Sequence, residues 1–176
     1  MKNPIRITIA LDEESNEIFN KLKESSKLSQ SEIIRRALKF YNSYRDFENY
    51  DMDKLRIYVE MLSEGEHVIL DMDHFVKFIH VLDTHPDKNK FLEIHREIAR
   101  SHAEQFSGKS PEYILRRLEA CNFFRINKIG NKEYTLVLIN YTIKEFVKIF
   151  LEEVLNNLGI KHEIKENLTK LRLKIL

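Results

Sequence analysis

The stretch that decides the fold is IRITIALDEE, Ile5 to Glu14, in a chain of 176 residues. Over its first seven residues, strongly apolar side chains alternate with others, which is the period-two pattern of a β-strand with one buried face. The β-branched residues favour the same conformation. Asp12 then suits a helix N-cap, because its carboxylate can accept a hydrogen bond from a free backbone amide. The stretch predicts a strand over residues 5–11 that leads directly into a helix.

Two helices are expected after this strand. The first runs from residue 13 to about residue 26, and its apolar stripe consists of Ile18, Phe19 and Leu22. After a short turn, Ser29 and Glu32 have the spacing of a capping box, in which the serine accepts from the Glu32 amide and the Glu32 carboxylate reaches back. The expected buried face of the second helix is Ile33, Ile34, Ala37, Leu38, Tyr41 and Tyr44. For Arg35 and Arg36, we expect one to face solvent and one to pair with Glu32 or a partner chain.

A lone strand of this kind cannot satisfy its backbone hydrogen bonds. A domain of about 45 residues also buries too little surface to be stable alone. Both problems are solved if two chains pair their strands antiparallel around a two-fold axis. We therefore expect a homodimer with a two-stranded ribbon above a four-helix core.

The segments IRITIALDEE (Ile5–Glu14) and LSQSEIIRRAL (Leu28–Leu38) give residues 4–44 a clear likeness to a known family. The order of strand, cap, helix, turn and helix resembles the ribbon-helix-helix DNA-binding proteins of the CopG, MetJ and Arc type. The resemblance implies that a dimer lays its ribbon in the major groove of double-stranded DNA. It also implies palindromic half-sites, and two such dimers could associate.

The resemblance also implies a set of DNA-binding residues. Side chains that read base edges would be Arg6, Thr8 and Ala10, with Ala10 offering only a small apolar contact. Backbone amides at the start of the second helix would hold a phosphate, and they belong to Ser29, Gln30 and Ser31. Further contacts to the DNA backbone would come from Lys2, Asn3 and Lys27.

Charge is nearly balanced over the whole chain but not along it. The net charge is +1, from 29 basic and 28 acidic residues. Counting Lys and Arg against Asp and Glu gives 9 − 6 = +3 for residues 1–45, 2 − 7 = −5 for 46–66 and +3 for 67–176. The sign change coincides with a loss of apolar periodicity. We therefore expect a DNA-binding domain over 1–45, a stiff junction without Gly or Pro over 46–53, and a second domain over 54–176.

The second domain is expected to be α+β and rich in helices. Helices are predicted at about residues 54–65, 71–84, 87–106, 110–121 and 142–158. The run HVIL, residues 67–70, is interpreted as a short buried strand. Two β-hairpins are predicted, one over 124–138 around a Gly-Asn turn and one over 162–175 turning near Asn167, with Ile164 opposite Leu171, Leu173 and Ile175.

Composition and motifs exclude several classes of protein. The single cysteine, Cys121, allows neither an intrachain disulfide nor a Cys-rich zinc site. No apolar run approaches the 18 residues of a membrane span, and the polar N-terminus is unlike a signal peptide, so we expect a cytoplasmic protein with no membrane partner. No catalytic signature is present, so we expect no enzyme.

The role of residues 54–176 stays open between three hypotheses: subunit contact, an organic effector, or a metal effector. Five histidines lie between His74 and His102, and His74, His95 and His102 are the metal-ligand candidates, although no firm metal or other cofactor is predicted. The chain is thus expected to be a transcriptional regulator, most simply a repressor. The alternatives are a DNA-binding antitoxin with a protein partner and a metal-responsive regulator.

Overall fold

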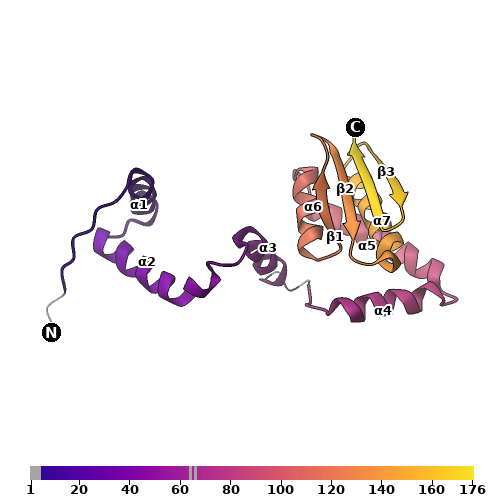
Figure 1. Ribbon diagram of the computed structural model, residues 1–176, viewed down its shortest axis with the longest axis horizontal. Coiled ribbons are helices and arrows are strands. Elements are labelled where there is room, and N and C mark those ends of the chain that lie inside the picture. The colour runs from indigo at the N-terminus through magenta and orange to yellow at the C-terminus, as the bar shows by residue number, and fades with distance from the viewer. Residues whose placement is uncertain (1–4, 64, 66) are drawn as a thin grey trace. The chain divides into compact units, whose positions relative to one another are not determined.

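A computed structural model of the chain describes residues 5–63, 65 and 67–176. It divides the chain into two compact units, Met1–Met52 and Asp53–Leu176, and each is described by itself below. Helices and a single four-stranded antiparallel sheet make the protein α+β, as the sequence predicts (Figure 1).

The first unit contains the two predicted helices. They are α1 (Glu13–Ser26) and α2 (Gln30–Tyr44), and α2 continues into the short 3-10 turn η1 (Arg45–Phe47). Asp12 caps α1 as predicted, because its carboxylate accepts a 2.7 Å hydrogen bond from the Ser15 amide. Lys27 ends α1 in the left-handed conformation, with φ of 55°. This single residue turns the chain toward α2.

Residues 5–11 are extended but form no β-strand among the described residues of the chain. This differs from the predicted strand, and the reason is physical. A strand exists through hydrogen bonds to a neighbouring strand, and the described part of one chain supplies none here. Within a single copy, the alternating sequence pattern is therefore not accompanied by the inter-strand hydrogen bonds of a β-sheet.

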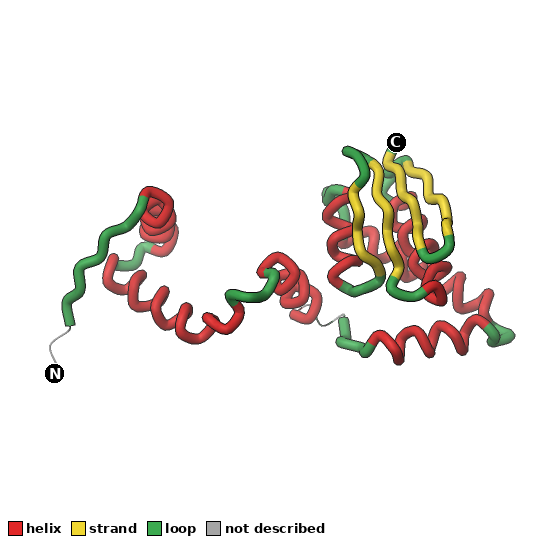
Figure 2. Tube along the Cα trace, in the orientation of Figure 1, coloured by secondary structure: helices red, strands yellow, loops and turns green. Residues whose placement is uncertain are grey.

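The second unit contains five helices and four strands among the described residues (Figure 2). The helices are α3 (Met52–Ser63), which starts at the unit boundary, α4 (Met72–Asp83), α5 (Lys88–Gln105), α6 (Pro111–Ala120) and α7 (Lys144–Asn157), with the 3-10 turn η2 (Tyr141–Ile143) before α7. The strands are β1 (Phe124–Lys128), β2 (Glu133–Leu138), β3 (His162–Asn167) and β4 (Lys170–Ile175).

The two predicted hairpins are confirmed, and they join into one sheet. Antiparallel pairs form between β1 and β2 and between β3 and β4, with Ile164 opposite Leu173. The sequence did not predict that β2 and β4 also pair, which gives the order β1-β2-β4-β3. One face of this sheet packs against α5, α6 and α7 (Figure 1). The core between these layers includes Phe124, Leu136, Leu151, Leu155 and Leu171, each with 1% or less of its surface exposed.

The predicted buried strand at residues 67–70 is wrong. These residues form no regular secondary structure, and Val68 and Ile69 are each 86% exposed. The four-stranded sheet is complete without them. A run of three apolar residues, Val68 to Leu70, therefore lies exposed between α3 and α4.

Candidate DNA-binding surface

The extended segment 5–11 alternates between two chemically different sets of side chains. Alternation along an extended chain directs Arg6, Thr8 and Ala10 to one side, and all three are exposed. On the other lie Ile5, Ile7, Ile9 and Leu11, which are 93%, 68%, 53% and 43% exposed. Four large apolar side chains in one row are stable in water only when another surface covers them.

The helices of the first unit add to this uncovered apolar surface. Of the described residues in the unit, only Ile33 is buried. Roughly half of the surface remains exposed for Ile18, Leu22, Leu38 and Tyr41, although the sequence predicts a buried role for each. The unit therefore lacks a core of its own within one chain. The predicted apolar stripes are present but have no covering surface in a single copy.

The turn between α1 and α2 presents the start of α2 to solvent. The Ser29 hydroxyl accepts a 3.3 Å hydrogen bond from the Glu32 amide, and the Ser29 carbonyl accepts from Glu32 and Ile33 at 3.0 Å. Gln30 and Ser31 occupy the first two helical positions, where backbone amides have no acceptor within the helix. Both residues are exposed. This geometry can hold an anion at the helix N-terminus.

Glu32 uses its carboxylate differently from the predicted capping box. One oxygen accepts from Arg35 at 2.8 Å, and the other accepts from Arg36 at 3.1 Å. Hydrogen bonds from these two guanidinium groups lower the pKa of the Glu32 carboxyl. The expectation that only one of the two arginines pairs is therefore wrong. A single carboxylate satisfies both, because both lie one helical turn further along α2.

An aromatic row at the end of α2 is a feature that the sequence pattern did not predict. The rings of Phe40 and Tyr44 lie 4.5 Å apart, Tyr44 and Phe47 6.1 Å, and Phe47 and Tyr50 5.7 Å. A hydrogen bond with Glu48 raises the pKa of Tyr41. These contacts tie α2 to η1 and the residues that follow.

Seven of the predicted DNA-binding residues lie on two exposed segments of the first unit. Arg6, Thr8 and Ala10 lie on the exposed segment 5–11, and alternation along an extended chain predicts that they share one side of it. Lys27, Ser29, Gln30 and Ser31 lie at the α1–α2 turn. Lys2 and Asn3 lie outside the described residues. The DNA-binding role of all nine residues stays a prediction.

An extended segment with one apolar face, followed by a capped helix, a tight turn and a second capped helix, is the architecture of small dimeric DNA-binding modules. Residues 5–42 match the model of a family described as ribbon-helix-helix protein, copG family. The resemblance seen in the sequence is therefore confirmed for this segment, and proteins of this family are DNA-binding regulators that bind DNA as dimers. Neither the curated proteins nor the solved structures contain a match to the chain. Among the described residues, no helix is both long and apolar enough to span a membrane.

The three metal-ligand candidates lie in different surroundings. His95 on α5 is buried, donates to the Phe146 carbonyl at 2.9 Å, and stacks on the Phe146 ring at 3.8 Å. His102 donates to the Ile98 carbonyl one turn earlier, and His74 lies 3.4 Å from the Asp71 carboxylate. Within residues 5–63, 65 and 67–176, no three His, Cys, Asp or Glu side chains are grouped as metal ligands. The structure does not bring the three histidines together.

We expect the buried His95 to make the stability of the second unit depend on pH. Burial lowers its pKa, so the folded protein disfavours the protonated ring. The unfolded chain protonates His95 near pH 6.5, so its stabilising contribution is complete above that value and decreases as the pH falls toward the folded pKa. Denaturant unfolding at pH values of about 7.5 and about 5.5, on either side of the unfolded pKa, should show this loss in the unaltered protein. In H95Q, which keeps an N–H donor but does not titrate, the loss should be smaller; an equal loss would contradict the prediction.

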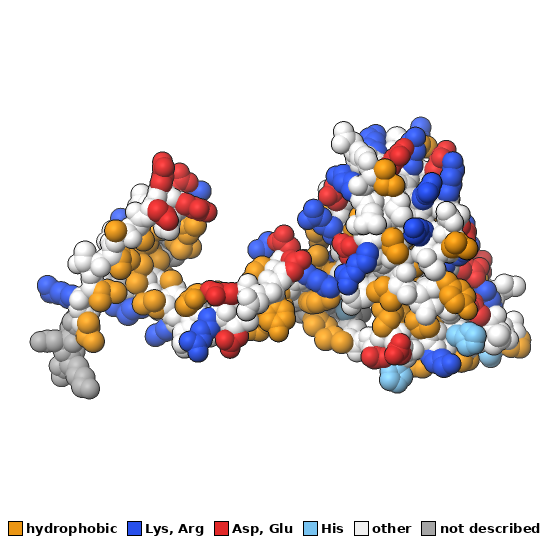
Figure 3. Space-filling model, in the orientation of Figure 1, with side chains coloured by type: hydrophobic (Ala, Val, Ile, Leu, Met, Phe, Trp, Pro, Cys, Tyr) orange, Lys and Arg blue, Asp and Glu red, His pale blue; other side chains and the backbone are white. Residues whose placement is uncertain are grey.

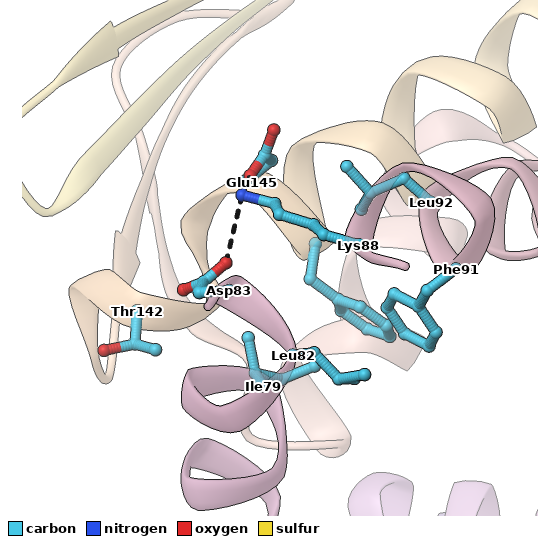
Figure 4. A pocket seen from close by; sticks show the side chains of 9 residues that line it. Ile79, Leu82, Asp83, Lys88, Phe91, Leu92, Thr142 and Glu145 are labelled. Atoms are coloured by element: carbon cyan, nitrogen blue, oxygen red, sulfur yellow. Dashed lines mark hydrogen bonds and ion pairs between the residues drawn. The ribbon is translucent and has the colours of Figure 1, made fainter. Parts of the chain in front are cut away.

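A small pocket lies between α4, the start of α5 and the η2–α7 segment (Figure 4). Lys88 closes one side of it by binding Asp83 at 3.1 Å and Glu145 at 2.7 Å. These two carboxylates raise the pKa of Lys88. The empty volume is about 260 Å³ even with open solvent included, below the roughly 300–1,000 Å³ of typical ligand sites. The one cation that lines the pocket, Lys88, is already paired with both of its carboxylates, which leaves little free chemistry for an effector.

Proposed function

We propose that the chain is a homodimeric, sequence-specific DNA-binding transcriptional regulator. The observation that carries this proposal is the row of exposed apolar side chains at Ile5, Ile7, Ile9 and Leu11, which alternates with Arg6, Thr8 and Ala10. Antiparallel pairing with the same segment of a second copy would satisfy the backbone and bury the apolar side against the helices. The family match at residues 5–42 supports the same arrangement.

In this dimer, the outward side of the ribbon enters the major groove of double-stranded DNA. Arg6 can donate two hydrogen bonds to O6 and N7 of guanine, and Thr8 can bind a base edge or contact a thymine methyl group. Ala10 adds only a small apolar contact. Phosphates on either side bind the start of α2 at Ser29, Gln30 and Ser31 and the cation of Lys27, with Lys2 and Asn3 as further backbone contacts.

The two-fold symmetry of the dimer has consequences for its DNA site. A symmetric reader calls for palindromic half-sites, and occupation of a promoter would make the protein a repressor. Two dimers on adjacent half-sites would form a dimer of dimers. An antitoxin whose C-terminal region folds on its toxin is the less favoured alternative, because residues 53–176 already have an extensive core.

For the second unit, we favour subunit contact over effector sensing. Large apolar side chains remain exposed on its first three helices, including Val59, Phe78, Val81, Ile94 and Ile98. The pocket beside Lys88 is small and its charges are paired. The surroundings of His74, His95 and His102 give little support to a metal-responsive regulator.

Selection of bound sequences from random DNA, followed by Arg6→Ala, tests the proposed function. The unaltered protein should enrich a palindrome. R6A should lose discrimination at one base pair in each half-site, by about 1–3 kcal/mol, while its circular dichroism stays unchanged. Competition titrations with specific and random duplexes measure this loss, and Lys39→Ala, on the exposed side of α2, is the control that should keep the selectivity. If R6A keeps the unaltered ratio of specific to random binding, Arg6 does not read DNA. If no sequence is enriched at all, the proposed function is wrong.

A further inference from the structure

The sheet of the second unit has one covered face and one open face. Strand alternation directs Phe124, Leu136, Leu171 and Leu173 into the core beneath α5, α6 and α7. The residues between them therefore point to the opposite face, which Figure 3 shows as a surface with many basic side chains. The basic residues of this open face are Arg125 on β1, Lys170, Arg172 and Lys174 on β4, and Lys165 on β3.

The strand register concentrates the positive charge at one end of the open face. Lys165 lies directly opposite Arg172, and both Arg125 and Lys170 lie opposite Val137. Like charges directly opposite each other destabilise a sheet. Since nothing in the fold requires cations at these positions, their placement favours a role in binding.

The shorter ion pair of this face lies at its other end. Lys174 lies in register between Glu133 and Glu163 and pairs with Glu133 at 3.2 Å. Lys165 makes a longer pair with Glu163, at 3.8 Å. No carboxylate of the described residues forms an ion pair with Arg125, Lys170 or Arg172. Three cations of the open face are therefore free to meet an external anion.

The centre of the open face has no aromatic side chain. Between the cations lie Thr135, which is 9% exposed, and the half-buried Val137. The aromatic residues of β1 and β2, Phe124 and Tyr134, are directed into the core. Proteins that hold single strands stack bases on aromatic rings. A surface with cations and without such rings suits the phosphate backbone of a duplex instead.

We propose that this open face, through Arg125, Lys165, Lys170 and Arg172, binds the backbone phosphates of double-stranded DNA without reading sequence. The inference rests on the proposed function, because the N-terminal unit of the same chain is the part that recruits the duplex. A duplex bound there is tethered to the same chain, which raises its effective concentration for a second surface that it can reach. Each phosphate contact would add affinity for any sequence and make binding more dependent on salt.

The test compares the unaltered full-length chain with R125Q/K170Q/R172Q, which removes three charges and keeps the side chains long. Fluorescence anisotropy measures binding to an operator duplex and to a random duplex, each long enough to extend beyond the two half-sites, over a series of KCl concentrations. For both duplexes, the slope of log Kobs against log[salt] should become shallower by about 0.9 for each phosphate that the variant no longer neutralises. The control is K174Q, at the neutralised end of the same face, which should keep the unaltered slope. Circular dichroism and thermal melting verify that all variants are folded.

The outcomes separate this inference from the proposed function. An unchanged slope in the folded triple variant would overturn the inference, while enrichment of a palindrome by the unaltered chain would leave the proposed function standing. Absence of duplex binding by the unaltered chain would overturn both. A loss of poly-glutamate binding with no change in duplex binding would assign the face to an acidic protein and likewise overturn the inference.

Discussion

Ile7→Asp is expected to abolish operator binding, with a decrease in affinity of at least about 100-fold. The free-energy cost of the buried charge converts into this factor because each 1.4 kcal/mol changes the binding constant tenfold. Ile7 lies in the middle of the apolar row and is 68% exposed in one chain. In the proposed dimer, the ribbon buries it against both pairs of helices. A carboxylate there is buried without a partner, which costs several kcal/mol, and each dimer contains it twice. Fluorescence anisotropy with the selected operator measures the decrease.

Thr8→Asp is the matched control for this prediction. It introduces the same charge one residue later, on the opposite side of the segment, which the dimer leaves exposed. T8D should also lose DNA binding, because its carboxylate repels the phosphates. However, it should keep the N-terminal unit folded, whereas I7D should not. Limited trypsin digestion within residues 5–44 distinguishes the two variants, and equal resistance of I7D and T8D would contradict the proposed dimer.

Much of the fold could be predicted because its signals are local. Asp12 and Ser29 cap helices through hydrogen bonds to amides three residues later, so their spacing alone indicates where α1 and α2 begin. In the same way, Ser110 caps α6 with Pro111 at its first position. The alternation KLRLKI in β4 predicts a strand with one buried face. The same alternation is the signal that could have revealed the cations of the open face.

What the sequence could not show depends on contacts between distant residues. The pairing of β2 with β4 joins two hairpins that are predictable one at a time, but no local signal specifies which strands become neighbours. The prediction of a strand at residues 67–70 is wrong for a related reason. A short, mostly apolar run suits a strand only when a partner strand is available, and Val68 and Ile69 have none in the described sheet.

In the candidate DNA-binding surface, too, local features could be predicted and features that depend on distant contacts could not. Side-chain alternation is a local property, so the two sides of residues 5–11 could be assigned from the sequence. Formation of the strand itself needs a second chain, so it is not seen in one copy. The choice of Glu32 between capping and pairing with two arginines depends on rotamers, which spacing does not determine.

Phe124→Ala is expected to lower the free energy of unfolding of the second unit by about 3–5 kcal/mol. Phe124 is fully buried at the first position of β1, within the core formed by the sheet and α5, α6 and α7. Removal of its ring leaves a cavity that a close-packed core can fill only in part. For a unit of this size, the change lowers the melting temperature by on the order of 10 °C. Differential scanning calorimetry of the full chain measures the shift.

The neighbouring Arg125→Ala supplies the control, because Arg125 is exposed on the open face and its removal should change stability by no more than about 0.5 kcal/mol. The pair of variants also tests whether the two units are thermodynamically separate. The hydrophobic core around Phe124 is made only of residues from Asp53–Leu176. F124A should therefore keep the base-pair selectivity of the unaltered chain at temperatures below its own transition. A loss of selectivity while the second unit is still folded would show that the core around Phe124 helps to position the ribbon on DNA.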